Sequence, residues 1–387
     1  MKKKILFIIW SFTAGGGAER ILANVANNLN PNKYEIDILE IVNFDINKEE
    51  VNDNINLLKP ILKYNNGSYV TRKISNLKSR FLYDTLCKNP SKIRNKVISK
   101  KYDVEISFNY LYPTFLLSDD SEVLKLSWIH SSIEDLDYRS IEDRRERIKI
   151  QEKYLLQKRH LEKVDHIITI SDRTFDSVNE LYPHLQYKNQ KIYNGYDFKD
   201  IERKREEEAN IEKKKNTIVT VSKIDERKNI PLLIEAAKLL KERSLEFNID
   251  IIGEGVETNN VKRLIKEYNL DDSVTMHGFK SNPYPYMKNA DVYCLTSFVE
   301  GFPTVLVESM SCGCPFISTK VAGLNELNPD ESCGISVDWD ANSVADALEL
   351  MLTNNELRSK KSKNCIETIK QFTLENQIKN IEKLLDN

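Results

Sequence analysis

The stretch TIVTVSKIDERKNIPLLIEAAKLLKERSLEFNIDIIG, residues 217–253, contains three successive structural patterns. Its two ends, residues 217–222 and 247–253, are short apolar runs rich in β-branched side chains, which predicts two strands. Residues 230–243 between them carry apolar side chains at helical spacing, and Pro231 suits the first turn of a helix. A strand, a helix and a second strand in this order predict parallel strands with the helix on one face of their sheet.

The same alternation continues on both sides of this stretch. Further strands are predicted at residues 4–10, 34–42, 103–108, 123–129, 166–170, 273–278, 291–296 and 314–319. Helices are predicted at residues 18–29, 144–162, 261–269, 303–311 and 372–387. Residues 197–216 are almost entirely charged or polar, which predicts a solvated linker or an exposed helix at a domain boundary. The chain is therefore expected to form two α/β domains, each a doubly wound parallel sheet.

The composition limits the class of protein. A chain of 387 residues with 40% hydrophobic and 30% charged residues suits two soluble globular domains. No run approaches the ~18 apolar residues that span a bilayer. The six cysteines form no CxxC pair, which favours free thiols in a reducing cytoplasm over a zinc site.

Two loops that follow predicted strands have residues suited to binding phosphate. The loop TAGGGAER, residues 13–20, combines three glycines with the start of a helix, where backbone comes close to a ligand and N–H groups are free. A tight turn explains the same glycines equally well. In the second loop, residues 221–229, Lys223 and Lys228 bracket a turn into a helix and could neutralise a diphosphate. A solvated charged turn is the alternative there.

A third loop and helix carry two carboxylates. In SFVEGFPTVLVESMSCGCPF, residues 297–316, Glu300 precedes the helix that Pro303 is expected to open. Helical spacing places Glu308 on a polar stripe of that helix. Carboxylates accept hydrogen bonds from vicinal hydroxyls, so two of them beside a phosphate-binding helix end predict a nucleotide sugar as the ligand.

These residues resemble a known family. Glu300 and Glu308 resemble the paired glutamates of retaining GT-B glycosyltransferases, and residues 297–319 resemble family 4 of that group, the group 1 glycosyltransferases. GGGAER, SKIDERKN, HGF at 277–279 and IYNGYD at 192–197 resemble further motifs of that family in the same order. The resemblance implies two Rossmann-like domains facing a central cleft. It implies an acceptor-binding domain at 1–197 with the closing helix 373–387, which crosses back to it, and a nucleotide-sugar-binding domain at 198–372.

The resemblance also implies roles for single residues of the second domain. Lys223 and Lys228 would hold the donor diphosphate, although Lys223 stands where the family usually has Arg, which weakens the case for bidentate contact. Glu308 would bind the ribose. Glu300 would hold the transferred sugar together with the backbone of Gly301, Phe302, Pro303 and Thr304.

Three further positions follow from the same resemblance. Backbone near Phe279 would contact the base, and Gly16 and Gly17 would lie near the donor phosphate. His130 matches the family's active-site histidine; taken alone, it would more often be structural.

The reaction implied is transfer of a hexose or N-acetylhexosamine, with retained configuration, from a nucleotide diphosphate sugar. A UDP-sugar is favoured as donor, and the acceptor would be a glycan or a lipid-linked glycan in bacterial capsule or O-antigen synthesis. No cofactor or metal is expected, because the lysines would supply the positive charge. A nucleotide-sugar epimerase of the same architecture and a non-catalytic sugar-binding partner are the alternatives. The incomplete GxGxxG argues against a dinucleotide oxidoreductase.

Residues 59–101 are strongly basic. They hold twelve Lys or Arg and one acid, Asp84, for a local charge of 12 − 1 = +11. Apolar residues lie among these cations, a mixture that suits the surface of an anionic membrane. A solvated basic face is an equal alternative, and no aromatic motif of an RNA-binding module is present. The protein is therefore expected in the cytoplasm, free or peripheral on the inner face of the membrane, with no nucleic-acid partner.

Overall fold

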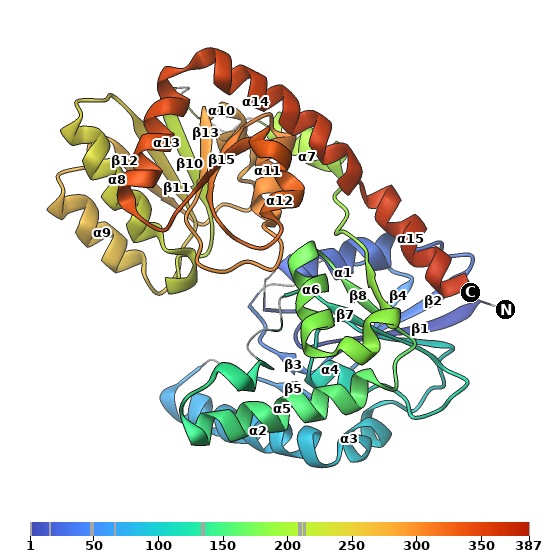
Figure 1. Ribbon diagram of the computed structural model, residues 1–387. Coiled ribbons are helices and arrows are strands. Elements are labelled where there is room, and N and C mark those ends of the chain that lie inside the picture. Colours follow the sequence, from blue (N-terminus) through green and yellow to red (C-terminus); the bar gives the residue numbers. More distant parts are fainter. Residues whose placement is uncertain are drawn as a thin grey trace. The chain divides into compact units, whose positions relative to one another are not determined.

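The computed structural model describes residues 2–14, 17–46, 50–65, 67–131, 133, 136–207, 211 and 214–386. The chain forms two compact units (Figure 1). Unit 1 comprises Met1–Tyr196 and Leu374–Asn387, and unit 2 comprises Asp197–Thr373. The chain therefore passes between the units at 196/197 and at 373/374. Each border lies one residue from the one expected from the sequence, 197/198 and 372/373.

Unit 1 is built on a parallel sheet of seven strands in the order β4-β2-β1-β6-β7-β8-β9. Its strands are β1 (Lys3–Ile9), β2 (Tyr34–Glu40), β4 (Ile55–Leu57), β6 (Val104–Ser107), β7 (Leu124–Ile129), β8 (His166–Thr169) and β9 (Asn189–Lys191). A separate parallel pair joins β3 (Val42–Asn43) to β5 (Leu62–Lys63). The order runs outward from β1 in one direction and then, from β6, in the other, which is the doubly wound arrangement.

Helices cover both faces of this sheet. One face carries α1 (Gly17–Asn28) with the C-terminal helix α15 (Leu374–Asp386). The other helices of unit 1 are α2 (Tyr69–Lys88), α3 (Pro90–Val97), α4 (Tyr112–Phe115), α5 (Arg144–Leu161) and α6 (Asp172–Leu181). Because β1 is covered on both sides, residues 5–9 are all buried and do not alternate in exposure.

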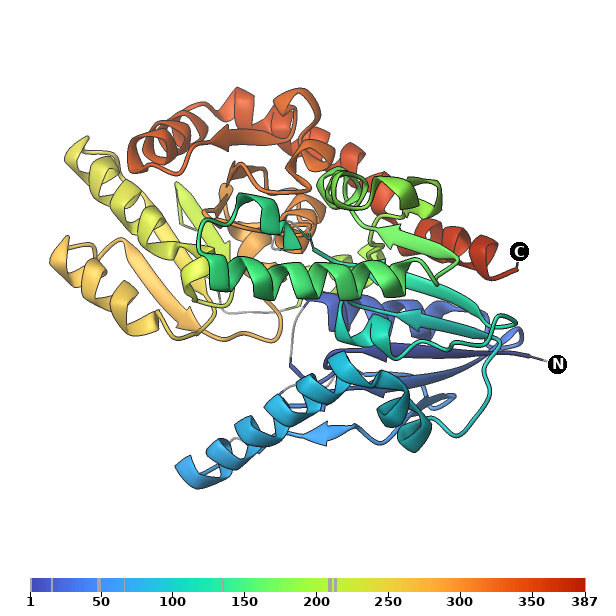
Figure 2. The ribbon, with the colours of Figure 1, turned by 60° about the horizontal axis from the view of Figure 1, so that its bottom comes forward.

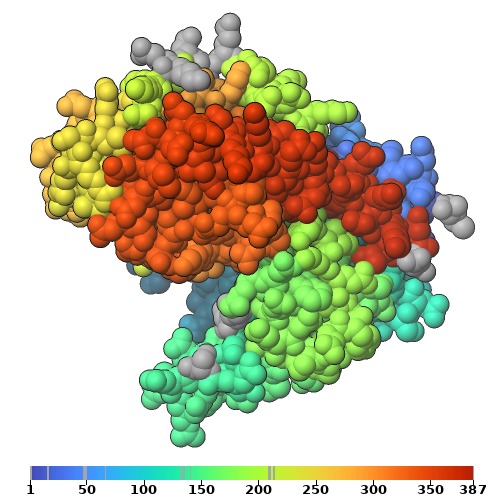
Figure 3. Space-filling view, turned by 45° about the horizontal axis from the view of Figure 1, so that its top comes forward, coloured from blue at the N-terminus to red at the C-terminus, as the bar shows by residue number. Residues whose placement is uncertain are grey.

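Unit 2 repeats the plan with six parallel strands in the order β12-β11-β10-β13-β14-β15. These are β10 (Thr217–Val221), β11 (Asn248–Ile252), β12 (Val274–Gly278), β13 (Val292–Leu295), β14 (Phe316–Thr319) and β15 (Gly334–Val337). One face packs against α8 (Ile230–Glu242), α9 (Thr258–Glu267) and α13 (Ala341–Thr353). The other helices are α7 (Phe198–Arg205), α10 (Tyr284–Asn289), α11 (Thr304–Ser311), α12 (Leu324–Leu327) and α14 (Asn355–Thr368). Figure 3 shows α13 and α14, in orange and red, as one continuous area of the unit 2 surface.

The fold class expected from the sequence is confirmed, and the differences concern single elements. The strands β4, β5, β9 and β15 were not predicted; β9 has the polar sequence NQK and is placed by its pairing with β8. Pro303 caps α11 and does not lie within its first turn. The first part of the charged stretch 197–216 is α7, which packs on α10 and α11. Arg205 of α7 donates to the Ser311 carbonyl oxygen at 2.7 Å.

Two simpler observations concern membranes and thiols. None of the helices described in the structure is both long and apolar enough to cross a membrane. All six cysteines are free thiols, and five of them are buried.

The C-terminal helix α15 is part of the core of unit 1. Its residues Ile381 and Leu385 are fully buried. At its end, the Tyr34 hydroxyl donates to Asp386 Oδ1 at 2.7 Å, and the Lys33 Nζ lies 2.9 Å from Asp386 Oδ2. Burial and the neighbouring Asp386 carboxylate raise the pKa of Tyr34, which keeps this hydroxyl protonated as a donor.

Replacing Leu385 with alanine should destabilise unit 1, because it removes buried methyl groups and leaves a cavity. The expected loss is about 2–5 kcal/mol. Scanning calorimetry would show one thermal transition lowered. Lys383→Ala, an exposed substitution on the same helix, should change little. Equal melting temperatures for wild type and Leu385→Ala would contradict the packing described.

Candidate functional site

The predicted donor loops of unit 2 lie where its strand order reverses. That reversal falls between the neighbouring strands β10 and β13. The loop with Lys223 and Lys228 follows β10, and the loop with Glu300 follows β13. Ligands of parallel sheets bind outside the carboxyl ends of the strands at such a point.

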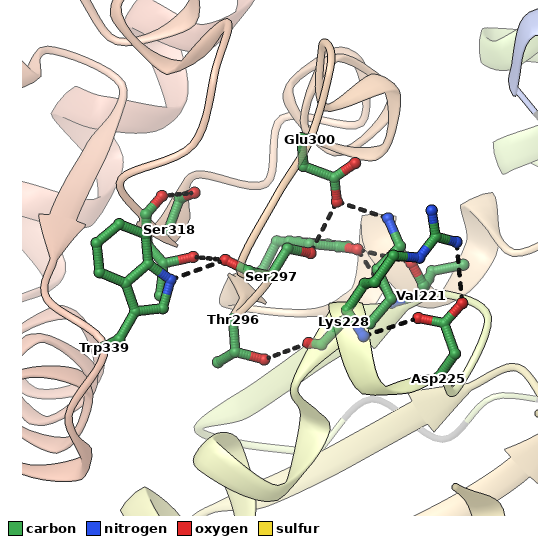
Figure 4. A network of polar contacts seen from close by, with 11 residues as sticks. Val221, Asp225, Lys228, Thr296, Ser297, Glu300, Ser318 and Trp339 are labelled. Atoms are coloured by element: carbon green, nitrogen blue, oxygen red, sulfur yellow. Dashed lines mark hydrogen bonds and ion pairs between the residues drawn. The ribbon is translucent and has the colours of Figure 1, made fainter. Parts of the chain in front are cut away.

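The structure brings Lys228 and Glu300 into direct contact. The Lys228 Nζ donates to Glu300 Oε1 at 2.5 Å (Figure 4), and both side chains are largely buried. The Ser297 hydroxyl donates to the same oxygen at 2.7 Å. A carboxylate held by both a cation and a hydroxyl is fixed in its orientation.

Backbone contacts join the two loops around this ion pair. The Thr296 hydroxyl donates to the Lys228 carbonyl oxygen at 3.0 Å, and the Phe298 N–H donates to the Arg227 carbonyl oxygen at 2.8 Å. Lys228 ends a single 3-10 turn, Glu226–Lys228, in which the Asp225 side chain accepts the Arg227 N–H at 3.1 Å. The lysine and the carboxylate are therefore positioned by one connected set of bonds.

Ser297 itself is anchored by two residues that the sequence did not single out. The indole Nε1–H of Trp339 donates to the Ser297 carbonyl oxygen at 3.0 Å, and the Thr319 hydroxyl donates to it at 2.6 Å. Trp339 follows β15, and Thr319 ends β14. Both therefore lie at the carboxyl ends of strands, which is the signal by which they could have been found.

Lys223 is placed differently from Lys228. Its side chain is exposed, and the structure records no ion pair between it and any residue described here. Its backbone is held between neighbours: the Ser222 N–H donates to the Ile252 carbonyl oxygen, and the Ile224 N–H donates to the Glu254 carbonyl oxygen, both at 3.0 Å. A mobile ammonium group on a fixed backbone can reach an anion that arrives at the loop.

Close packing at this loop depends on glycine. Gly253 has φ +135°, and a Cβ added there would lie 1.8 Å from the Ser222 carbonyl oxygen. A Cβ on Gly255 would lie 2.1 Å from the Ile224 carbonyl oxygen. The loops after β10 and β11 can approach this closely only because neither glycine has a side chain.

Glu308 is buried in α11, but so are all residues from 306 to 311, so the polar stripe expected from helical spacing is not set apart by its exposure. The Tyr284 hydroxyl donates to Glu308 Oε1 at 3.3 Å. Of the residues expected to present backbone, Phe302 is buried with its ring 5.5 Å from that of Phe372, and Pro303 is also buried. Gly301 and Thr304 are half-buried beside them. Their predicted backbone contacts with a sugar stay a prediction.

Phe279 follows β12 with its ring exposed. Its backbone N–H, the group expected to meet a base, lies 3.4 Å from Glu254 Oε1. Before it, Gly278 has φ +68° and His277 Nε2 lies 2.7 Å from Asp250 Oδ1. The carboxylates of Glu254 and Asp250 therefore contact the end of β12 and the loop that follows it.

In unit 1, His130 lies directly after β7, where the sequence placed it. Its ring packs on Phe108 and Trp128, with ring centroids 4.3 and 5.5 Å away. Its Nε2 is inaccessible to solvent and has no hydrogen-bond partner among the described residues. Burial lowers the pKa of His130 to about 3, so the imidazole is neutral near pH 7.

The glycine loop of unit 1 is partly described. Gly17 opens α1, and Gly16 lies outside the described residues. The start of the loop is fixed by the buried Glu40, whose Oε2 accepts the Phe12 N–H at 2.9 Å and the Thr13 hydroxyl at 3.1 Å. This role of Glu40 was not predicted.

Within the part of the chain that the structure describes, no group of three or more His, Cys, Asp or Glu could hold a metal ion. The expectation of a reaction without metal stays a prediction.

Comparison with known proteins agrees with this geometry. Residues 201–371 match the family model of glycosyl transferases group 1. The chain is 34% identical over 198 residues to the N-acetylgalactosamine-N,N'-diacetylbacillosaminyl-diphospho-undecaprenol 4-alpha-N-acetylgalactosaminyltransferase of Campylobacter jejuni, which covers 51% of the chain and 53% of that protein. It is 32% identical over 148 residues to the amylovoran biosynthesis glycosyltransferase AmsK of Erwinia amylovora, 36% of each protein. The chain thus spans about half and about a third of these two relatives.

A solved structure supports the fold over the whole chain. Anabaena Alr3699/HepE, in complex with UDP and glucose, is similar with a TM-score of 0.70 at 16% identity, covering 100% of both chains. The two Rossmann-like units therefore have the GT-B fold.

Gly253→Ala should destabilise unit 2 in two ways. The positive φ strains any residue with a side chain, and the new Cβ would also collide with the Ser222 carbonyl oxygen. Gly313→Ala is the matched control: Gly313 has φ +76°, but its Cβ would meet only Ser362 Oγ at 3.6 Å. The control should cost about 1–2 kcal/mol. Calorimetry should show a larger fall in melting temperature for Gly253→Ala, and equal falls would rule out the close approach.

The stability of unit 1 should fall as the pH is lowered below 6.5. The pKa of His130 is about 3 in the folded protein against 6.5 ordinarily, so the unfolded chain takes up this proton first. The free energy of unfolding should therefore drop by up to about 1.4 kcal/mol per pH unit between pH 6.5 and 3. Burial also lowers the pKa of His160, to about 4, and adds to the same window.

Calorimetry at pH 7.5 and 5.5 on wild type and His130→Gln would separate the two histidines. The variant should lose about 1 kcal/mol less than wild type over this range. An unchanged pH dependence in His130→Gln would show that His130 is not held neutral by burial.

Proposed function

We propose that this protein is a retaining glycosyltransferase. It transfers a hexose or N-acetylhexosamine from a UDP-sugar to a glycan or lipid-linked glycan acceptor in bacterial surface polysaccharide synthesis. The observation that carries the proposal is the Lys228–Glu300 ion pair at the strand-order reversal of unit 2, next to the helix that bears Glu308. The match of residues 201–371 to glycosyl transferases group 1 supports the same assignment.

The ion pair suggests how a donor would enter. A diphosphate brings two adjacent anionic groups, which compete with Glu300 for the Lys228 ammonium. When Lys228 turns to the phosphates, the Glu300 carboxylate is left with the Ser297 hydroxyl and with free lone pairs for the hydroxyls of the transferred sugar. The exposed Lys223 would add the second positive charge.

The remaining residues of unit 2 would fix the nucleoside. The Glu308 carboxylate, to which the Tyr284 hydroxyl donates, would also accept hydrogen bonds from the two ribose hydroxyls. Backbone near Phe279 would contact the base. The preference for UDP is taken from the structure of Anabaena Alr3699/HepE, which binds UDP and glucose.

The bond between the sugar's anomeric carbon and the diphosphate oxygen breaks, and a bond to the acceptor oxygen forms on the same face. The acceptor's proton passes to the departing diphosphate. Lys223 and Lys228 stabilise the negative charge that develops there, so this chemistry calls for no metal or cofactor. The neutral His130, with its unpartnered Nε2, is assigned to a hydroxyl of the transferred sugar, and Gly16 and Gly17 to the donor phosphate.

The acceptor class rests on the relatives. The Campylobacter jejuni protein is named for a diphospho-undecaprenol acceptor and the Erwinia amylovora protein for amylovoran biosynthesis. A polyprenyl-diphosphate-linked glycan is therefore the acceptor we propose to try first. With such an acceptor, we propose that the protein works in the cytoplasm, at the inner face of the membrane.

Thermal unfolding with UDP, GDP, ADP and NAD tests the donor site. UDP at about 100 times its Kd should stabilise the protein by about 2.7 kcal/mol. Glu308→Gln and Lys228→Met should lose most of this stabilisation, because each removes one charged contact with the nucleotide. Glu267→Gln and Lys262→Met, exposed on α9, are the matched controls and should keep it.

Other outcomes would redirect the proposal. No stabilisation by any nucleotide in a folded protein would favour a non-catalytic partner, and stabilisation by NAD alone would favour an oxidoreductase. Conversion of a UDP-sugar without acceptor to its epimer would indicate the epimerase. Transfer to an acceptor, with the anomeric configuration read by NMR, would establish or refute retention.

A further inference from the structure

The basic segment 59–101 contains one long helix, α2, with two opposite sides. Ser68 caps it by accepting the Thr71 N–H at 3.3 Å. Its inner side is buried against unit 1 and consists of Ser75, Ser79, Leu82 and Leu86. The helix lies at an edge of unit 1 in two views that differ by 60° (Figures 1 and 2).

The outer side of α2 is apolar and exposed. Val70, Ile74, Leu77 and Phe81 expose 62%, 49%, 71% and 75% of their surfaces. They follow one another at intervals of four, three and four residues, so they form a single stripe along the helix. At about 100° per residue this stripe points about 140° away from the buried side. Exposed apolar residues gathered in one patch mark a binding surface more often than residues exposed singly.

Cations border this stripe on both sides. By the same helical spacing, Lys73 and Arg80 lie along one flank and Lys78 along the other. Lys88 continues the line of the stripe at the end of the helix, and Arg72 lies elsewhere. Asp84, the single acid, lies on the flank of Lys73 and Arg80, and α2 carries 5 − 1 = +4. The structure records no ion pair between these five cations and the residues it describes.

Other cations of the segment are already engaged within unit 1. Arg94 binds the buried Glu105 at 2.5 Å, and Lys100 lies 2.5 Å from Glu35 and 3.2 Å from Asp37. Leu82, Leu86 and Ile98 belong to the core. The part of residues 59–101 that is both cationic and apolar at the surface is therefore the outer face of α2.

We propose that the outer face of α2 docks flat on an anionic lipid bilayer. The stripe Val70, Ile74, Leu77 and Phe81 enters the interfacial layer, and Lys73, Lys78 and Arg80 reach the lipid phosphates alongside. Long cationic side chains beside an apolar stripe suit this placement, since their stems follow the apolar surface and their charges stay with the headgroups. This inference rests on the proposed function, because the proposed acceptor is carried by a membrane lipid. It adds the surface by which the protein would reach that membrane.

The charge of α2 favours a bilayer over a second copy of the chain. Spacing of four, three and four residues could also form the seam of a helix pair. Two copies of α2 would bring +4 against +4, with only Asp84 on each to form a cross-helix ion pair. An anionic leaflet instead attracts every cation, and each one near the surface raises the partition coefficient by about fivefold.

Co-sedimentation with vesicles tests the proposal on the full chain. Vesicles of phosphatidylcholine alone are compared with vesicles that also hold about one third phosphatidylglycerol. Wild type should bind the anionic vesicles only. Two double variants should each lower the partition coefficient by about tenfold or more: Leu77→Ser with Phe81→Ser, and Lys73→Glu with Lys78→Glu.

Matched variants elsewhere control for general stickiness and charge. Tyr187→Ser replaces an aromatic residue that is also 75% exposed, and Lys262→Glu with Lys266→Glu reverses two exposed charges on α9. Both should bind vesicles as wild type does. The thermal shift with UDP should be the same in all these variants, so a failure of docking is distinguished from a failure of the donor site.

Three results would overturn the proposal. The first is no binding of wild type to anionic vesicles, and the second is wild-type binding by both α2 double variants. The third is a wild-type dimer in solution that becomes a monomer in Leu77→Ser with Phe81→Ser while vesicle binding is absent, which would assign the face to a second copy.

Discussion

The ion pair between Lys228 and Glu300 is the contact on which the arrangement of the candidate site depends. Two loops from different strands meet there, and two further hydrogen bonds join them, one from the Thr296 hydroxyl and one from the Phe298 N–H. Removing one partner would leave a largely buried charge without compensation, which costs more than the pair contributes. Under the proposed function, the donor diphosphate would replace Glu300 on Lys228 while the other bonds between the two loops remain.

The location of the pair follows from topology. In both sheets the strand order turns at the first strand and continues on its other side, so helices leave on opposite faces and the loops between them diverge. In unit 2 this point receives the lysine loop after β10 and the glutamate loop after β13. Glycines at 253 and 255 then let the loop after β11 lie against the lysine loop. In unit 1 the glycine-rich loop follows β1 at the corresponding position, next to β6.

The elements that local composition determines were predicted from the sequence. The strands and contacts that depend on residues far away in the chain were missed. Apolar runs such as those in β1, β10 and α8 were located within one or two residues, because their composition alone requires burial. The polar strand β9 was missed because only its neighbour β8 makes it a strand. Lys228 and Glu300 were each assigned to a ligand, but their mutual contact spans 72 residues and has no local signal. Trp339 was missed for the same reason.

Helix α2 shows a different limit. Its inner side combines two serines with two leucines, and its outer side exposes four large apolar residues, so apolar residues lie on both sides of the helix. The periodicity of apolar residues alone therefore does not show which side of α2 faces the core. The neutral state of His130 is a similar case, since it depends on Phe108 and Trp128 closing over a ring that the sequence placed correctly.

The position of α15 has a consequence for how the protein is made. Unit 2 is inserted within unit 1, because the residues that complete the core of unit 1 follow all of unit 2 in the chain. During synthesis the N-terminal sheet emerges first, yet the surface that receives Ile381 and Leu385 stays uncovered until unit 2 has left the ribosome. The unit that begins first is therefore finished last, and its exposed apolar surface is a natural substrate for chaperones during that interval.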